Sequence, residues 1–222
     1  MSLPKQQNYE YAYQLAYKLA YEQLTKIGDI DRLCLRSGAQ YQVIDSQKII
    51  LLEYLNQTYQ ITLPDIDISL IDSQQEVPIR DKILILHYLT SAKGSPISNK
   101  VIAYRELPEG ANYFSTFYKR AIKPLLDYFG KEPRLLIEAA KKLGGYEADY
   151  GDVAVTIDAF SRVPITLILW RGDDEFAPEG SILFDSTISD HLSTEDINVL
   201  CETTAWKLVK SLNSVEDLKR SR

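Results

Sequence analysis

Two kinds of hydrophobic spacing alternate along the chain, and together they predict helices separated by groups of strands. Residues 4–26 carry apolar side chains at helical spacing and lead to Gly28, a residue suited to the position after a helix. Between residues 41 and 63 the pattern changes to short alternating runs, divided by polar turns. This region predicts a three-stranded antiparallel meander, with a fourth short strand over 66–70.

The helical spacing returns over residues 79–92, after Pro78 at a position where proline suits the start of a helix. Gly144-Gly145 later marks the end of another helix, and Ser193 is a suitable N-cap for the last one. The remaining predicted elements are a strand over 101–106, helices over 113–129 (broken near Pro124), 133–143 and 193–212, a hairpin of 152–157 with 164–170, and an edge strand over 181–184.

Strand groups separated by helix pairs are typical of an α+β fold, with a mainly antiparallel sheet flanked by helices. The hydrophobic fraction of 45% and the charged fraction of 25% are ordinary for a globular protein. We find no internal repeat and no linker-like change of composition. The sequence therefore predicts a single α+β domain over residues 1–222.

Charge and cysteine content exclude several classes of function. The net charge is −6, and no run of Lys or Arg exceeds two residues, so we expect no nucleic-acid partner. Cys34 and Cys201 are too few for a disulfide scaffold or an iron–sulfur site. No leader-like segment opens the chain and no apolar run approaches 18 residues, so we expect a cytoplasmic protein without a membrane contact.

The strongest candidate for a site is the second half of the segment VPITLILWRGDDEFAPEGSILFD, residues 163–185. A strand-like apolar run ends at Trp170, and a second apolar run, residues 182–184, ends just before Asp185. The candidate ligand-binding residues of this hairpin are Trp170, Asp173, Asp174, Glu175, Phe176 and Asp185. We expect Trp170, Phe176 and Phe184 to be buried beneath the charged turn.

The four carboxylates of this hairpin leave two interpretations open. Magnesium or calcium prefers oxygen ligands, so Asp173, Glu175 and Asp185 could form a cation site if they converge. Acidic residues are also common in solvated turns. Side chains alternate in direction along an extended strand, so at most two of the three consecutive acids can point to one place. No zinc, serine-hydrolase or phosphate-loop motif occurs, so we assign no catalytic residue, no metal ligand and no cofactor.

Arg105 and Glu106 form a second candidate group, at the end of the strand predicted over 101–106. An arginine in this position can clamp a carboxylate or a phosphate, or can pair with the acids of the hairpin. The histidines are isolated. We expect His87 to be a hydrogen-bonded core residue and His191 to be exposed.

Four segments carry a resemblance to a known family: ILHYLTSAKGSP, YRELPEGANYF, Gly144-Gly145 before YEADYGDVAV, and RVPITLILWRGDDEFAPEGSILFDSTISDHLSTED. The chain resembles the domain of unknown function 3786 family over residues 9–209. The resemblance implies an origin in anaerobic prokaryotes, where some members are fused to a four-cysteine iron–sulfur module like that of corrinoid methyl-transfer proteins. With two cysteines, this chain lacks that module.

Three functions remain open at this point. The first, which we carry forward, is a non-catalytic accessory module that binds a small ligand or a protein partner at the hairpin and is associated with corrinoid and iron–sulfur systems. The second is a metal-assisted enzyme that uses the same carboxylates. The third is a structural protein whose acids form only internal salt bridges.

Overall fold

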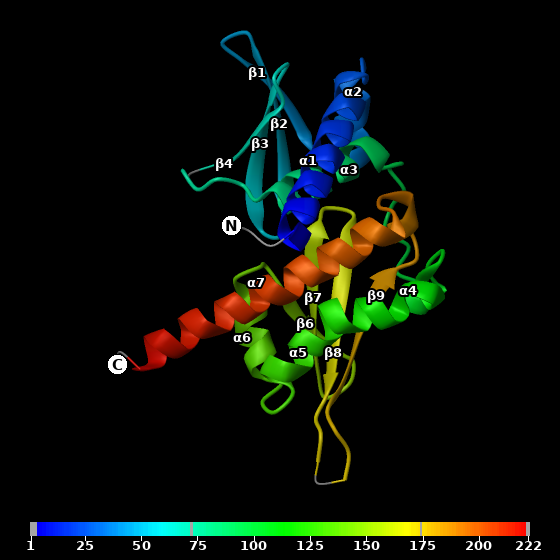
Figure 1. Ribbon diagram of the computed structural model, residues 1–222, viewed down its shortest axis with the longest axis vertical. Helices are drawn as coiled ribbons and strands as arrows, with labels where there is room; N and C mark the ends of the chain where they lie inside the picture. The colour runs from blue at the N-terminus through cyan, green and yellow to red at the C-terminus, as the bar shows by residue number, and fades with distance from the viewer. Residues whose placement is uncertain (1–3, 72, 174, 221–222) are drawn as a thin grey trace.

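The computed structural model describes residues 4–71, 73–173 and 175–220 and arranges them as two antiparallel sheets with helices packed against them (Figure 1). The α+β class predicted from the sequence is therefore confirmed. One sheet is built from the N-terminal part of the chain and the other from the C-terminal part. Asp174, one of the candidate ligand residues, lies outside the described residues.

The first sheet is a meander whose strands follow one another in space as they do along the chain. Its strands are β1 (Gln40–Ile44), β2 (Gln47–Tyr54), β3 (Gln57–Leu63) and β4 (Asp67–Leu70). Two residues with positive φ form each of its first two turns, Asp45-Ser46 and Leu55-Asn56. This backbone geometry matches the twist of the flanking strands. The predicted meander and its fourth strand are confirmed.

Helices α1 (Pro4–Thr25) and α3 (Ile79–Ser91) pack against each other beside this sheet. Between them in sequence lies α2 (Ile30–Ser37), which the hydrophobic spacing did not predict because eight residues are too few to show it. Its ends nevertheless carry local signals. Asp29 accepts the Arg32 N–H at 2.9 Å, and Gly38 ends the helix with φ of 72°.

The second sheet has the spatial order β5-β9-β8-β7-β6. Its strands are β5 (Val101–Ala103), β6 (Tyr146–Ala148), β7 (Val153–Phe160), β8 (Val163–Trp170) and β9 (Glu179–Asp185). The hairpin of β7 and β8 was predicted correctly. The expectation that the last strand lies at an edge was wrong, because β5 pairs along its outer side with Val101 opposite Asp185. The short strand β6 was not predicted.

The helices of the C-terminal part pack on the second sheet, where α4, α5 and α7 lie in front of its long strands in Figure 1. They are α4 (Gly110–Phe117), a π-helical turn (Tyr118–Ile122), α5 (Lys123–Phe129), α6 (Leu135–Lys141) and α7 (Thr194–Arg220). The predicted break near Pro124 takes the form of the π turn just before it. Proline has no N–H to donate to the preceding turn, which explains why the regular α-helical pattern is interrupted in the turn before Pro124.

Most of the buried apolar residues of both sheets belong to one cluster. Phe160 joins the two sheets, because its ring stacks on Tyr54 with ring centres 4.8 Å apart and on Tyr88 at 4.0 Å. The Leu55 N–H also donates to the carbonyl of Ala159 at 3.0 Å. The single domain over residues 1–222 stays a prediction, since only unfolding shows whether the two sheets are lost together.

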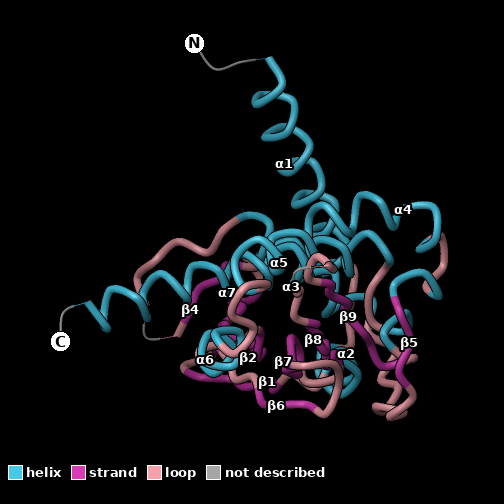
Figure 2. The backbone as a smooth tube through the Cα atoms, turned by 90° about the horizontal axis from the view of Figure 1, so that it is seen from below, coloured by secondary structure: helices cyan, strands magenta, loops and turns pink. Residues whose placement is uncertain are grey.

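The first part of α1 and the last part of α7 extend away from the rest of the molecule (Figure 2). Within the described ranges, no helix combines the length and the apolar character needed to cross a membrane.

Candidate functional site

The hairpin loop between β8 and β9 projects from the second sheet, at the lower end of the molecule in Figure 1. Asp173 organises it: its Oδ1 accepts the backbone N–H of Glu175 at 2.9 Å and that of Phe176 at 2.8 Å. These hydrogen bonds lower the pKa of the Asp173 carboxyl. Asp173 therefore stabilises a turn through its side chain, as aspartate commonly does.

Asp185 lies at the other end of β9 and does not converge with Asp173. The strand runs from Glu179 to Asp185, which separates that carboxylate from the loop by about 20 Å. Asp185 instead accepts the N–H groups of Ser98 (3.1 Å), Asn99 (2.7 Å) and Thr187 (3.0 Å). Burial acts to raise its pKa, but hydrogen bonds from Thr187 and Ser98 outweigh burial and lower the pKa to about 2.

The predicted aromatic floor of the hairpin is only partly present. Phe184 is buried, with 1% of its surface exposed, but Trp170 is 39% exposed and Phe176 is 70% exposed. The prediction of burial was therefore wrong for Trp170 and Phe176. Both lie where the hairpin extends past the core, whereas Phe184 points inward toward Phe117, with ring centres 6.4 Å apart.

Arg105 and Glu106 form a 3₁₀ turn with Tyr104 rather than the end of a strand. The Arg105 guanidinium lies 3.7 Å from the centre of the Phe114 ring, a cation–π contact. The Glu106 carboxylate accepts the N–H of Ala103 at 2.7 Å. No ion pair between described residues joins Arg105 to the acids of the hairpin. The structure thus keeps Asp173, Glu175 and Phe176 around one hollow of about 590 Å³ at the hairpin and places Arg105, Glu106 and Asp185 elsewhere.

A cation site of several carboxylates is also missing from the part of the chain that the structure describes. No three His, Cys, Asp or Glu side chains there are grouped in a way that could hold a metal ion. This finding agrees with the separation of Asp173 and Asp185. The ligand-binding roles assigned to the hairpin residues individually stay predictions.

A further cleft lies between the 3₁₀ turn and α4 on one side and the start of α7 on the other. We call it the α4–α7 cleft, and its volume is about 560 Å³. It is lined by Tyr104, Pro108, Glu109, Tyr113, Thr116, Arg120, Thr194, Glu195, Asn198 and Val199. Clefts of this size and mixed polarity are typical of small-molecule sites.

The two walls of the α4–α7 cleft run in the same direction. At one end, the Thr194 hydroxyl donates to the carbonyl of Pro108 at 2.7 Å. At the other end, Arg120 Nη1 lies 3.8 Å from Glu202 Oε2. Side chains three or four residues apart share a helix face, so Tyr113, Thr116 and Arg120 line one wall while Glu195, Asn198 and Glu202 follow the other.

Asn198 is the unusual residue of this cleft. Only 9% of it is exposed, and its Oδ1 atom is buried without a hydrogen-bond partner among the described residues. Leaving a buried acceptor unpaired costs about 1–3 kcal/mol. Such a group in a native protein calls for an explanation, and a ligand or a water that donates to it is one.

Arg120 supplies the positive charge of the cleft. The carboxylate of Glu202 is already held by Arg80, through Nη2 at 2.7 Å and Nη1 at 3.2 Å. The contact of Arg120 with the same carboxylate is much longer, at 3.8 Å. Because the bidentate pair with Arg80 occupies both oxygens of Glu202, that carboxylate does not need Arg120 as a partner. The guanidinium of Arg120 therefore keeps donors for an incoming anion.

Local backbone features explain how the first wall is placed. Any side chain on Gly110 would overlap the carbonyl oxygen of Tyr104, so only glycine allows α4 to start this close to the 3₁₀ turn. Glu109, just before it, has a left-handed φ of 59°, a strained conformation for a residue with a side chain. Tyr104 stacks on Phe117 with ring centres 3.8 Å apart. Arg120 lies in the π turn, an element often found at functional sites.

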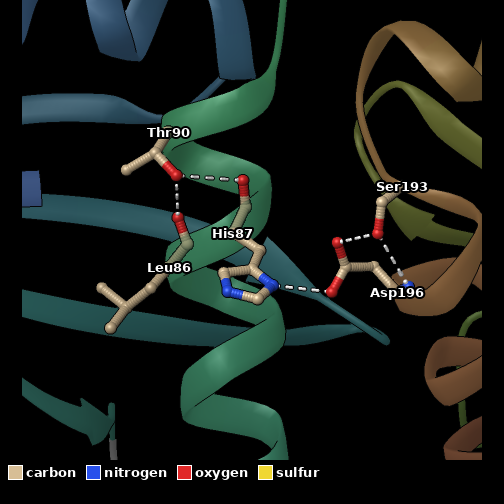
Figure 3. A network of polar contacts seen from close by, with 5 residues as sticks. All are labelled: Leu86, His87, Thr90, Ser193 and Asp196. Carbon is tan, nitrogen blue, oxygen red and sulfur yellow. Dashed lines mark hydrogen bonds and ion pairs between the residues drawn. The ribbon is translucent and has the colours of Figure 1, made fainter. Parts of the chain in front are cut away.

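A second polar group joins α3 to the first turn of α7 (Figure 3). His87 Nδ1 lies 2.6 Å from Asp196 Oδ1, and the Ser193 hydroxyl donates to Asp196 Oδ2 at 2.6 Å. The hydrogen bond to Asp196 raises the pKa of His87 despite partial burial. Ser193 contacts the carboxylate, and the second ring nitrogen of His87 points away from both residues. A serine-hydrolase triad, in which the histidine lies between the serine and the acid, is therefore not present. The group instead ties α3 to α7.

His191 is fully buried, so the expectation that it is exposed was wrong. It follows the 3₁₀ turn Ile188–Asp190, which leads the chain into the core just before α7. Neither ring nitrogen has a hydrogen-bond partner within normal geometry in the part of the chain that the structure describes. Burial lowers the pKa of His191, and its ring lies 6.2 Å from that of Tyr88.

Sequence reasoning missed the cleft because its residues lie on two segments about 80 positions apart. The helical spacing of Tyr113, Thr116 and Arg120 does indicate that these three side chains share one helix face. The spacing of Glu195 and Asn198 indicates the same for a second helix. Nothing in that spacing indicates that the two faces meet.

Fold and cleft together define an α+β protein with two antiparallel sheets and a cleft of mixed polarity between two helices of its C-terminal part. A family model, described as a domain of unknown function (DUF3786), matches residues 29–206. The chain belongs to this family, as its sequence motifs indicated. No match was found among curated proteins or solved structures.

Proposed function

We propose that this protein is a non-catalytic binding module and that its small ligand occupies the α4–α7 cleft. The observation that carries the proposal is the buried, unpaired Oδ1 of Asn198 in the wall of that cleft. A bound group that donates a hydrogen bond would remove the cost of this unpaired acceptor. Binding would rotate the amide part-way about χ2, a soft torsion in asparagine, so that Oδ1 reaches the cleft.

The chemistry of the lining favours recognition over catalysis. Arg120, Thr116 and Asn198 offer hydrogen bonds on rigid helices, and Val199 with Pro108 offers apolar contact. Burial, together with Cys201 and Tyr113, raises the pKa of Tyr104. A raised pKa moves this phenol further from the neutral range in which an acid–base catalyst works best.

The proposal moves the expected ligand away from the hairpin, because Asp173 and Asp185 each have internal hydrogen-bond partners. An association with anaerobic corrinoid and iron–sulfur systems, or with a protein partner, stays a prediction that rests on the family resemblance alone. No observation favours the metal-assisted enzyme.

A thermal-shift screen of small metabolites on the full chain tests the proposal. We expect at least one compound to raise the melting temperature of the wild type and to lose this effect in an Asn198→Leu variant, which keeps the side-chain size. The control is Arg171→Gln, a charge change in the hairpin loop, which should respond like the wild type. A compound whose effect survives Asn198→Leu but is lost in Arg171→Gln would place the site at the hairpin and contradict the proposal.

A further inference from the structure

We infer that the α4–α7 cleft takes a short zwitterionic peptide, a dipeptide, with its carboxylate at Arg120 and its ammonium group at Asn198 and Glu195. This inference deepens the proposed function and rests on it. The cleft is polarised along its length, with Glu109 and Glu195 toward one end and Arg120 toward the other. A ligand with opposite charges at its two ends matches this arrangement.

The carboxylate end follows from the charge balance around Arg120. Arg80 already neutralises Glu202 through two hydrogen bonds, so one positive charge is left for a ligand. A singly charged carboxylate balances that charge and fits the planar guanidinium. A doubly charged phosphate would leave one negative charge unbalanced beside Glu202, which is unfavourable where carboxylates are close.

The ammonium end follows from the acceptors on the opposite part of the wall. Asn198 Oδ1 lacks a donor, and Glu195 is an exposed carboxylate three residues before it on α7. An ammonium group carries three N–H donors and no acceptor, so it can serve both oxygens at once. The carboxylate of Glu109 already accepts the side-chain amide of Asn112 at 3.0 Å, so Glu195 is the better partner for the ammonium group.

The length of the ligand follows from the spacing along α7. Four residues separate Asn198 from Glu202, beside which Arg120 lies, and this corresponds to about 6 Å along the helix axis. A fully extended dipeptide spans about 7 Å, whereas a single amino acid spans about half of that. A dipeptide therefore reaches both ends of the cleft, and a single amino acid reaches one.

Isothermal titration calorimetry of the full chain tests the inference. The probes are the alanyl dipeptides with each standard residue in the second position, then the tightest one with its amino group acetylated or its carboxylate amidated. We expect the free dipeptide to bind at least tenfold more tightly than either capped form. Free single amino acids should bind more weakly by a similar factor.

Two variants assign the ends of the ligand. Arg120→Gln should remove the preference for a free carboxylate and keep the preference for a free ammonium group, and Glu195→Gln should do the reverse. Both side chains are exposed, so both variants should fold, and an unchanged melting temperature checks this. Arg171→Gln is the matched control and should bind like the wild type.

Each contrary result has a distinct meaning. Absence of binding heat for the whole dipeptide set, or equal affinity for capped and free forms, overturns the dipeptide inference. If an uncharged metabolite nevertheless raises the melting temperature in an Asn198-dependent manner, the binding module stands and only its ligand class changes. If no compound of either kind depends on Asn198, the proposed function fails as well.

Discussion

Asp185 and Asn198 show how much a residue's surroundings decide its role. The sequence singled out Asp185 because a charged residue follows an apolar run, yet the chain around Ser98 and Asn99 surrounds that carboxylate with donors. Asn198 drew no attention, because a single asparagine in the first turns of a helix is unremarkable until its burial is known. Residue types were therefore predictable, while partners contributed by distant segments were not.

Replacing Asp185 tests its structural role. Asp185→Asn keeps the shape but weakens charge-assisted hydrogen bonds, and we expect a loss of about 2 kcal/mol in the free energy of unfolding at neutral pH. Because the folded pKa is lowered to about 2, the stabilisation is full above the unfolded pKa of about 3.9 and is lost as pH falls toward 2. Urea unfolding between pH 2 and 7 measures this. A variant as stable as the wild type would contradict it.

His87 should make stability depend on pH in the opposite direction. Its pKa is raised by Asp196, so the stabilisation is full below the unfolded pKa of about 6.5 and is lost as pH rises through the folded pKa. We expect His87→Gln to cost about 1 kcal/mol at pH 5.5 and less at pH 8.5. Urea unfolding of both proteins at the two pH values tests this, and a cost that grows with pH would contradict it.

At the scale of elements, hydrophobic spacing predicted the long helices and the hairpins well. It failed where an element is short, as in α2 and β6, or where a strand acquires a neighbour from far along the chain, as β9 does from β5. Pairing of that kind depends on the whole topology, which a local pattern does not contain. The expected break in the helix near Pro124 did appear, as a π turn that carries Arg120 into the cleft.

The start of α4 offers a test at this scale. Gly110→Ala would place a methyl group against the carbonyl of Tyr104, so the helix would have to move and the cleft with it. We expect a loss of about 2 kcal/mol or more in the free energy of unfolding, as for other overpacked sites. Thermal unfolding measures it, with the exposed substitution Ser115→Ala on the same helix as the control. Equal stability of both variants would show that the close approach is unimportant.

At the scale of the whole molecule, Phe160 connects the two sheets through its contacts with Tyr54 and Tyr88. If the chain is one domain, Phe160→Ala should destabilise both sheets together, by about 3–5 kcal/mol. Hydrogen exchange can follow amides of β2 and β8 separately. We expect protection to fall equally in both strands, whereas loss in one sheet alone would indicate two independent domains.

The proposed function depends on Asn198 receiving a ligand in the α4–α7 cleft. The most direct measurement is an NMR titration of the full, ¹⁵N-labelled chain with the tightest compound from the screen, following the side-chain amide of Asn198. We expect this signal and those of Arg120 and Thr116 to shift most and to saturate together. Shifts concentrated in residues 171–178 of the hairpin, with the Asn198 signal unchanged, would contradict it.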